Sequence, residues 1–273
     1  MTTVAAIPFP AIDPVLFQLG PIGIRWYGLA YLAGFALAYL GLRVLIRRRE
    51  LRIEPSALGD LVSYAAAGVV VGGRAGWWLF YHWGTTAGSP WYEPFAIWHG
   101  GMSFHGGLVG VAVALLLWSR RRRASFWNVA DNVALMAPVG LCFGRLANFI
   151  NAELVGRATT VPWGVIFPGD TFARHPSQLY EAVLEGPVLL SAMLLLRPWT
   201  RDQDGRLSAW LLILYGLFRF AVEFTRQPDA QLGFIAFGWL TMGQLLSLLL
   251  SLAGVLLAVL RRHTAPTLQA ADA

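Results

Sequence analysis

Residues 126–156 read FWNVADNVALMAPVGLCFGRLANFINAELVG, an apolar run that ends in a cluster of polar side chains. The part from 126 to 145 has the length of about 20 residues that a helix needs to cross a hydrocarbon core. Arg145, Asn148 and Asn151 then follow at intervals of three, so on a continuing helix they would share one face. Ionisable groups at membrane depth cost roughly 2.5–3.5 kcal/mol each. We therefore expect this face to line a cavity and to hold a polar, anionic group at the membrane boundary.

The composition predicts an all-α protein that crosses a membrane several times. Hydrophobic residues make up 56% of the 273 residues, charged residues make up 13%, and the mean hydropathy is +0.55. Soluble proteins contain roughly 25% charged residues. Apolar runs of spanning length recur. We predict seven transmembrane helices, at residues 23–42, 59–81, 103–119, 126–145, 178–196, 208–225 and 237–260. Cys142 is the one cysteine, which excludes an intrachain disulfide, and we interpret it as a packing residue.

The basic residues indicate the topology. All 21 are arginines, and most fall in four clusters separated by pairs of apolar runs. The clusters are Arg43, Arg47, Arg48, Arg49 and Arg52; Arg120, Arg121, Arg122 and Arg123; Arg197, Arg201 and Arg206; and Arg261 and Arg262. Because short arginine-rich loops stay in the cytoplasm, the N-terminus is predicted outside and the C-terminus in the cytoplasm. The net charge of +6 is thus a topology signal and argues against nucleic-acid binding.

We expect one transmembrane catalytic domain, residues 1–263, with additions on its outer face. Residues 8–22 are rich in proline and are predicted to form an interfacial arm. Residues 83–102 carry the aromatic side chains typical of a headgroup interface. Residues 146–177 form a second predicted outer loop, and the tail 264–273 is predicted to be disordered.

The arginines outside the clusters point to a binding site. They lie in predicted spans or toward the outer side, where topology disfavours positive charge. A guanidinium donates paired hydrogen bonds to phosphate. Arg145 and Arg219, on different helices at similar depth, could therefore clamp a phosphate headgroup, and Tyr215 and Glu223 share the stripe of Arg219. Alternatively, Arg219 and Glu223, four residues apart, simply neutralise each other.

His105 begins the third predicted span and is followed by Gly106 and Gly107. Histidine titrates near neutral pH, and glycine allows close approach of a backbone, so the pair is compatible with catalysis. A single histidine at a helix end is also commonly structural. Metal binding through His99 and His105 lacks supporting carboxylates, and we expect no metal site.

Several motifs together resemble the prolipoprotein diacylglyceryl transferase family. They are His-Gly-Gly-Leu at 105–108, Gly-Arg-x-x-Asn-Phe-x-Asn-x-Glu-x-x-Gly at 144–156, Arg-His-Pro-Ser-Gln-Leu-Tyr-Glu at 174–181, Phe-Arg-x-x-x-Glu-Phe-x-Arg-Gln-Pro-Asp-Ala-Gln at 218–231, Trp-Tyr-Gly at 26–28 and Thr-Met-Gly-Gln at 241–244. They extend over nearly the whole chain. The segment between Gly156 and Arg174 is shorter than in several members of the family, which affects substrate docking there.

The resemblance implies an enzyme of the bacterial inner membrane with seven spans and an active site toward the periplasm. Such an enzyme transfers the diacylglyceryl group of phosphatidylglycerol to the lipobox cysteine of a preprolipoprotein and releases glycerol phosphate. It performs the first step of lipoprotein maturation and needs no cofactor, because the phosphodiester already activates the lipid.

The resemblance also implies roles for individual residues of this chain. Arg145 and Arg219 would stabilise the leaving phosphate, and His105 would act as general base or position the headgroup. The residues implied in substrate binding are Tyr27, Asn148, Asn151, Glu153, Gly156, Tyr215 and Glu223, with Glu223 bracing Arg219 and Gly156 permitting close approach.

Two other classes of function place arginines in a membrane. A transporter of an anionic solute would have repeated or inverted halves, and none is visible in the sequence. A lipid-binding scaffold without catalytic activity would account for the arginines, although not for the histidine beside paired glycines.

Overall fold

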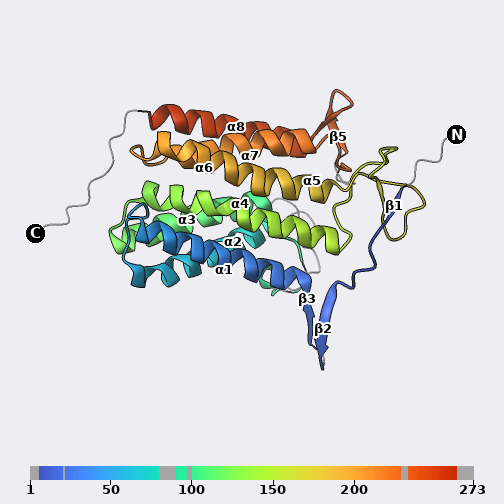
Figure 1. Cartoon of the computed structure of the whole chain (residues 1–273), viewed down its shortest axis with the longest axis horizontal. Coiled ribbons are helices and arrows are strands. Elements are labelled where there is room, and N and C mark those ends of the chain that lie inside the picture. Colours follow the sequence, from blue (N-terminus) through green and yellow to red (C-terminus); the bar gives the residue numbers. More distant parts are fainter. Residues whose placement is uncertain are drawn as a thin grey trace, which may run out of the picture. The chain divides into compact units, whose positions relative to one another are not determined.

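The computed structural model describes residues 6–20, 22–79, 90, 92–96, 100–228 and 233–262. Its chain is mostly helical (Figure 1). The long helical elements are α1 (Trp26–Arg47), α2 (Leu58–Trp77), α3 (Phe104–Arg122), α4 (Phe126–Ile150), α5 (Ser177–Val183) continued by the π-helical turn η6 (Leu184–Val188) and by α6 (Leu189–Thr200), α7 (Arg206–Val222) and α8 (Met242–Leu260). Each overlaps one predicted span.

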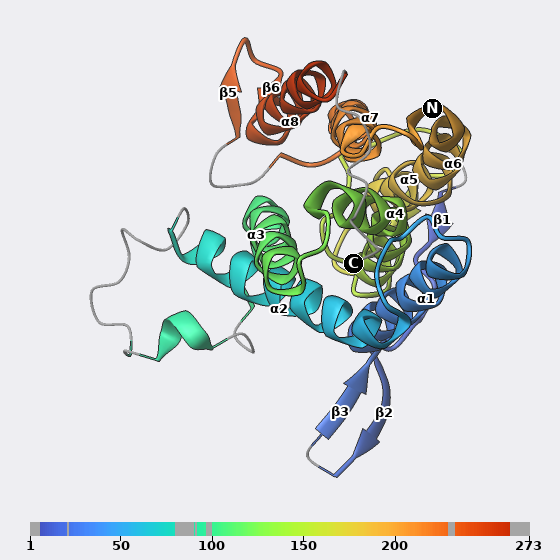
Figure 2. The same ribbon diagram turned by 90° about the vertical axis from the view of Figure 1, so that its left-hand side faces the viewer.

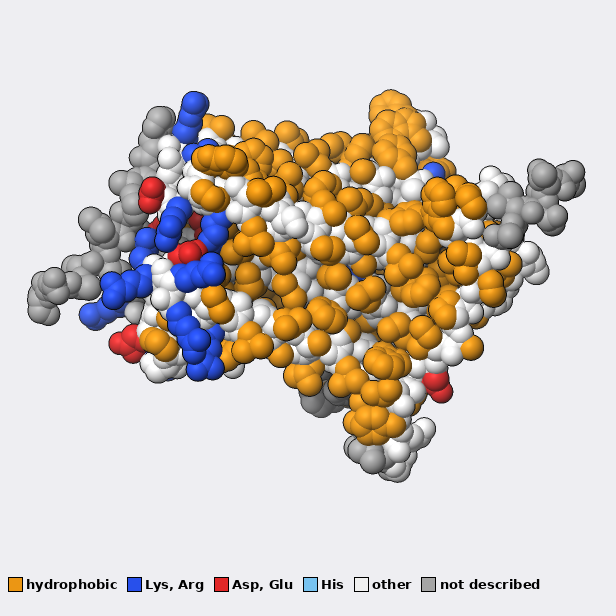
Figure 3. All heavy atoms as spheres, viewed as in Figure 1, with side chains coloured by type: hydrophobic (Ala, Val, Ile, Leu, Met, Phe, Trp, Pro, Cys, Tyr) orange, Lys and Arg blue, Asp and Glu red, His pale blue; other side chains and the backbone are white. Residues whose placement is uncertain are grey.

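Five of these segments are long and apolar enough to cross a membrane: Trp26–Arg47, Pro55–Trp77, Phe126–Ile150, Ser177–Thr200 and Met242–Leu260. The chain is therefore a polytopic helical membrane protein by length and composition. Two other predicted spans are less clear, since α7 has only 17 residues and α3 ends on Arg120, Arg121 and Arg122. Figure 3 shows hydrophobic side chains over the flanks of the helices and arginines at helix ends. On α8, Leu252 is 63% exposed and Leu256 60%, as expected for side chains that face lipid.

Helix α4 extends beyond the predicted end at residue 145. It continues to Ile150, and the backbone N–H of Asn151 still donates to the carbonyl of Ala147 at 3.0 Å. The polar side chains of residues 145–150 do not end the helix, because its backbone hydrogen bonds are satisfied within the segment. Arg145 and Asn148 therefore lie one turn apart on one helix, which ends at Ile150.

The all-α expectation missed short strands outside the spans. The described residues form three two-stranded sheets. In these sheets β1 (Ile7–Pro8) pairs parallel with β4 (Val165–Ile166), β2 (Val15–Leu19) pairs antiparallel with β3 (Ile22–Arg25), and β5 (Phe234–Ala236) pairs antiparallel with β6 (Leu240–Thr241). The second half of the predicted arm 8–22, from Val15 onward, thus belongs to a β-hairpin that leads directly into α1. Most of the predicted loop 83–102 and the whole tail 264–273 lie outside the described residues.

The contacts divide the chain into two compact units. Among the described residues, one comprises those up to 41 and from 133 onward, and the other comprises those from 42 to 132. In the first unit α7 and α8 pack side by side, as both views show (Figures 1 and 2). Gly216 makes this contact close, because a Cβ there would lie 2.2 Å from the hydroxyl oxygen of Ser251.

In the second unit, α2 packs against α3 through glycines on both helices. A Cβ on Gly106 would lie 2.4 Å from the carbonyl oxygen of Gly72 and 2.8 Å from the Cα of Gly76, and Gly110 approaches Gly68 in the same way. Small residues allow such close backbone approach between helices in membranes. Ser103 begins α3 as its N-cap and accepts a hydrogen bond from the backbone N–H of Gly106 at 3.2 Å.

Candidate active site

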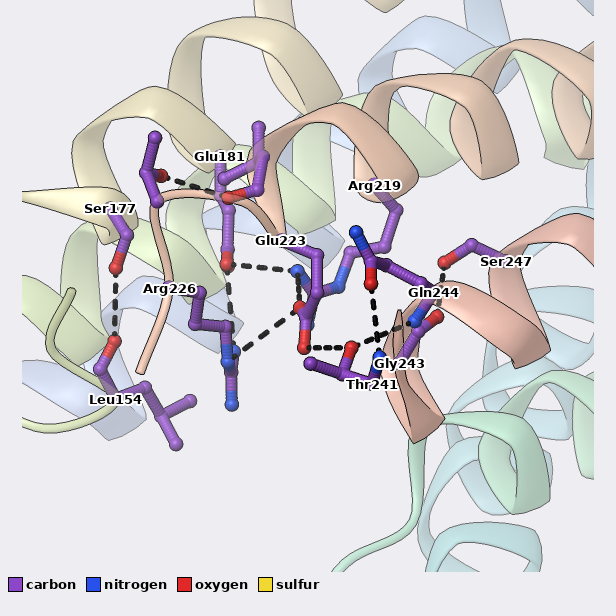
Figure 4. Close-up of polar contacts among 12 residues, drawn as sticks. Leu154, Ser177, Glu181, Arg219, Glu223, Arg226, Thr241, Gly243, Gln244 and Ser247 are labelled. Carbon is purple, nitrogen blue, oxygen red and sulfur yellow. Dashed lines mark hydrogen bonds and ion pairs between the residues drawn. The ribbon is translucent and has the colours of Figure 1, made fainter. Parts of the chain in front are cut away.

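A buried network of arginines and glutamates lies in the first unit, and Glu181 on α5 is its centre (Figure 4). Glu181 is 1% exposed, and both of its carboxylate oxygens form ion pairs with arginine side chains. Oε2 lies 2.8 Å from Nη1 of Arg145 on α4. Oε1 lies 3.3 Å from Nη1 of Arg219 on α7 and 3.5 Å from Nη1 of Arg226. One carboxylate therefore joins three arginines from separate parts of the chain.

Glu185 supplies a second carboxylate to Arg145. Its Oε2 lies 2.9 Å from Nε of Arg145, and the residue is fully buried. Glu181 and Glu185 are four residues apart, so both project toward α4. Between α5 and α6, Gly186 leaves helical geometry and Pro187 follows it. A Cβ on Gly186 would lie 2.6 Å from the Cβ of Cys142, so the missing side chain lets this span approach α4 closely.

Glu223 supplies the third carboxylate. Its Oε2 lies 2.7 Å from Nη1 of Arg219 and 4.0 Å from Nε of Arg226. The ion pair between Arg219 and Glu223 that the sequence offered as an alternative is therefore present. This ion pair is not the sole contact of the Arg219 guanidinium, because Nη1 of Arg219 also pairs with Glu181.

The network is neutral in total, and its arginines are less deeply buried than its carboxylates. The side chains of Glu181, Glu185 and Glu223 are 1%, 0% and 5% exposed, whereas those of Arg145 and Arg219 are 15% and 14% exposed. Within the described parts of the chain, Nη2 of Arg145 has no hydrogen-bond partner, and neither do Nε and Nη2 of Arg219. Nε and Nη2 form one edge of a guanidinium, the edge that binds two oxygens of a phosphate together. Arg219 thus keeps a complete two-donor edge, and Arg145 keeps a single open nitrogen.

Tyr215 lies one turn before Arg219 on α7 and is buried. Its hydroxyl interacts electrostatically with Glu185, Arg145 and Arg219. The structure therefore brings together four residues that the sequence analysis assigned to one binding site, namely Arg145, Tyr215, Arg219 and Glu223.

A second polar group surrounds Glu153, just beyond the end of α4. Its Oε1 accepts hydrogen bonds from the side-chain amides of Asn148 and Asn151, each at 3.1 Å. The Tyr27 hydroxyl, at the start of α1, interacts with Asn148 and Glu153. Ala152 and Leu154 on either side of Glu153 have positive φ angles of 53° and 57°. Such backbone is uncommon for residues with a side chain and is concentrated at functional sites.

Gly156 allows a close approach, although between parts of the protein itself. A Cβ there would lie 2.3 Å from the carbonyl oxygen of His175 and 2.7 Å from that of Thr225. Its backbone N–H donates to His175 at 3.1 Å. The glycine therefore joins the segment after α4 to His175 and to the segment that follows α7 and carries Arg226.

His175 itself is held by its neighbours at the entrance to α5. The Tyr180 hydroxyl accepts from the indole N–H of Trp163 at 2.7 Å and lies 3.2 Å from Nδ1 of His175. Partial burial lowers the pKa of His175, so the imidazole is neutral at neutral pH.

His105 lies in the first turn of α3, in the second unit, half-buried and with its ring 5.4 Å from that of Phe104. The structure gives Gly106 a structural task, namely packing against α2. The close backbone approach predicted for this glycine is therefore an approach to α2. The role predicted for His105, as general base or in positioning the headgroup, stays a prediction.

The sequence reasoning missed Glu181 and Glu185 as members of the network. Glu181 ends the motif at 174–181, and Glu185 is a carboxylate four residues later inside an apolar run, so intramembrane charge was the available signal. Other arginines outside the clusters have structural partners. Arg74 donates to the backbone carbonyl of Pro94 at 3.1 Å, Arg157 to that of Arg226 at 2.8 Å, and Arg174 binds Asp170 through two nitrogens.

These features define a membrane protein whose helices enclose ionisable groups that expose arginine donors. The profile of the prolipoprotein diacylglyceryl transferase family matches residues 14–260, and the chain belongs to this family. Its relatives include proteins named phosphatidylglycerol–prolipoprotein diacylglyceryl transferase. The one from Chromohalobacter salexigens is 49% identical over 94% of this chain and 95% of its own length. The one from Rhodospirillum rubrum is 50% identical over 96% of both chains, and the one from Nitratidesulfovibrio vulgaris is 50% identical over 91% of this chain and 94% of its own.

Proposed function

We propose that this chain is an enzyme that transfers the diacylglyceryl group of phosphatidylglycerol to a cysteine thiol of a prolipoprotein, the first step of lipoprotein maturation. Membership of the family and the names of its near full-length relatives support this reaction. The structural observation that carries it is the network in which three buried carboxylates hold Arg145 and Arg219 while other donor nitrogens of both arginines remain open. Such donors suit a phosphate group that must be stabilised as it leaves.

The reaction forms one bond and breaks another. The substrate thiol loses its proton, because the thiolate is the nucleophile. The thiolate attacks the glycerol carbon that bears the phosphate, a carbon–sulfur bond forms, and the carbon–oxygen bond breaks. Glycerol phosphate leaves with the electron pair and with growing negative charge on its oxygens. Preorganised donors at that position stabilise the transition state more than the ground state.

We assign the donor roles from the open nitrogens. The Nε and Nη2 edge of Arg219 binds two phosphate oxygens, and Nη2 of Arg145 binds a further oxygen. Tyr215 supports this site, and Glu223 braces Arg219. The group of Tyr27, Asn148, Asn151 and Glu153 orients the substrate, and Gly156 keeps the outer loop in place beside it. From the family resemblance, His105 accepts the thiol proton or positions the headgroup. No cofactor or metal takes part in this scheme.

The membrane arrangement follows from the arginine clusters. The chain crosses the bacterial inner membrane seven times and forms one catalytic domain, residues 1–263. Its N-terminus and active site face the periplasm, its C-terminus faces the cytoplasm, and its protein partners are signal peptides with a lipobox cysteine. Nucleic acid is not a partner, because the arginines serve topology and the buried network.

Incubation of the purified protein with phosphatidylglycerol and a lipobox peptide tests the proposal. We expect a thioether-linked diacylglyceryl peptide and an equal amount of glycerol phosphate, both measured by mass spectrometry. A peptide with serine in place of the lipobox cysteine is the control and should remain unmodified. Binding of the lipid without either product would indicate a scaffold. Movement of an anionic solute into vesicles without product would indicate a transporter.

The variant His105→Gln separates two roles of this histidine. If His105 is the base, the variant should bind phosphatidylglycerol normally, react at least about tenfold more slowly, and recover partly at alkaline pH, where free thiolate accumulates. If it positions the headgroup, lipid affinity should fall and alkaline pH should not help. Profiles of rate against pH, together with lipid-binding isotherms, distinguish these outcomes. Normal turnover at neutral pH would eliminate both roles.

Reporter fusions test the topology. Fusions after Arg123 and Arg262 should report the cytoplasm, because each follows an arginine cluster. Fusions near Ser89 and Pro168 should report the periplasm. Alkaline phosphatase and green fluorescent protein, which are active on opposite sides of the membrane, provide matched readouts at every position. A cytoplasmic signal at Pro168 would contradict the seven-span arrangement and would place Arg145 away from the outer leaflet.

A further inference from the structure

At the start of α8, Thr241 and Gly243 contact the carboxylate of Glu223 (Figure 4). We call these two residues the seat of Glu223. The hydroxyl of Thr241 lies 3.0 Å from Oε1 of Glu223, and Thr241 and Glu223 are both buried. Thr241 is also the N-cap of α8, since its hydroxyl oxygen accepts from the backbone N–H of Gln244 at 3.2 Å. A hydroxyl has one hydrogen. Because the oxygen accepts from Gln244, that hydrogen is donated to Glu223.

Gly243 completes the seat by having no side chain. A Cβ at this position would lie 2.6 Å from Oε1 and 2.8 Å from the carboxyl carbon of Glu223. The carboxylate therefore rests against the bare backbone of the helix start. The N-terminus of a helix carries a partial positive charge, which favours an anion there.

The seat determines how Arg219 is held. With Oε1 of Glu223 fixed by Thr241, Oε2 points to Nη1 of Arg219 at 2.7 Å. Glu181 reaches the same nitrogen from α5 at 3.3 Å. Two carboxylates on one nitrogen restrict rotation of the guanidinium and direct its Nε and Nη2 edge away from them. The start of α8 thus acts on Arg219 through Glu223.

We propose that Thr241 and Gly243 are positioning residues for phosphate binding, which they support by holding Glu223 and hence the open edge of Arg219. The proposal rests on the transferase function proposed above. The sequence offered Thr241–Gln244 only as part of the family resemblance, whereas the contacts show that Thr241 and Gly243 hold Glu223.

A matched pair of variants at position 241 tests the hydrogen bond. Thr241→Val keeps the shape but removes the hydroxyl, and Thr241→Ser keeps the hydroxyl. We expect Thr241→Val to lower kcat/KM of transfer about tenfold or more, because small misplacements of catalytic groups have effects of this size. Thr241→Ser should stay within about twofold of the parent protein, since its hydroxyl still donates to Glu223.

Gly243→Ala tests the seat without removing the N-cap. The added Cβ displaces the end of a flexible side chain, so the fold should survive while Glu223 moves and kcat/KM falls about tenfold. Gly254→Ala is the control for general packing damage, because a Cβ there meets the carbonyl oxygen of Ala209 at 2.8 Å in another part of the contact between α7 and α8. At equal thermal stability, Gly243→Ala should be the less active of the two.

A double-mutant cycle shows whether the effect passes through Glu223. In a Glu223→Ala background, Thr241→Val and Gly243→Ala should each change kcat/KM by less than about twofold, because no carboxylate remains to be held. Full additivity of these changes, or equal activity of Gly243→Ala and Gly254→Ala at equal stability, would overturn the positioning role. If the unmodified protein forms no thioether product, the proposed function fails instead.

Discussion

Arg219→Lys is expected to lose transfer activity by about 10²- to 10³-fold while the protein still folds, the effect of removing one preorganised donor site from a developing oxyanion. Lysine can replace the ion pair that Nη1 of Arg219 makes with Glu223 and Glu181. It cannot at the same time present the separate two-donor edge that remains open in the arginine. Turnover with phosphatidylglycerol and a lipobox peptide, with thermal unfolding in the same detergent, measures both parts of this expectation.

Two further variants make the result interpretable. Arg122→Lys changes an exposed arginine that pairs with Asp60 at 2.7 Å and should leave turnover within about twofold, since surface ion pairs contribute little. Arg145→Lys should also lose most activity, but partly for another reason, because one ammonium must replace two nitrogens that bind Glu181 and Glu185. Near-normal turnover of Arg219→Lys would show that Arg219 is a structural partner of Glu223 and not a phosphate ligand.

Glu181→Ala is expected to destabilise the protein by about 3–5 kcal/mol and to abolish transfer, because removing one member of a buried ionic group leaves its partners without compensation. Three arginines share this carboxylate, from α4, from α7 and from the segment after it. Thermal unfolding and the transfer assay provide the measurement.

Two further variants test whether the loss of stability comes from removing the buried charge of Glu181. Glu181→Gln keeps the shape and the acceptor oxygen but not the charge, so its loss of stability should lie between those of the parent protein and Glu181→Ala. Glu54→Ala removes an exposed carboxylate and should change stability by no more than about 0.5 kcal/mol. A Glu181→Ala protein with unchanged unfolding temperature and activity would show that the arginines do not depend on Glu181.

The sequence predicted the helices well because a membrane constrains each segment separately. Every backbone polar group in lipid must be satisfied within its own helix, so a sufficiently long apolar run predicts a helix without knowledge of its neighbours. The same logic singled out Arg145 and Arg219, since an arginine in an apolar run requires an explanation. It ended the span at residue 145, whereas the spacing of Arg145 and Asn148 already assumed a continuing helix, and α4 does continue to Ile150.

The partners of the arginines, in contrast, were decided by the tertiary structure. Glu185 lies 40 residues from Arg145, and Glu181 lies 38 residues from Arg219. Local spacing predicts neighbours three or four residues apart, as it did for Arg219 and Glu223. It contains no information on which helix packs against which. The kink at Gly186 and Pro187, and the fit of Gly186 against Cys142, place both carboxylates against α4.

The sequence alone thus determined that this is a polytopic helical membrane protein, which charged residues its membrane part contains, and which family it resembles. These properties follow from hydropathy, charge and local motifs, which act within single segments. Only the tertiary structure decided which nitrogens of Arg145 and Arg219 are occupied and which remain open, that Gly106 packs against α2, and that the start of α8 holds Glu223. These depend on close contacts between segments distant in the chain, where a single Cβ or hydroxyl changes the distance that a neighbour can adopt.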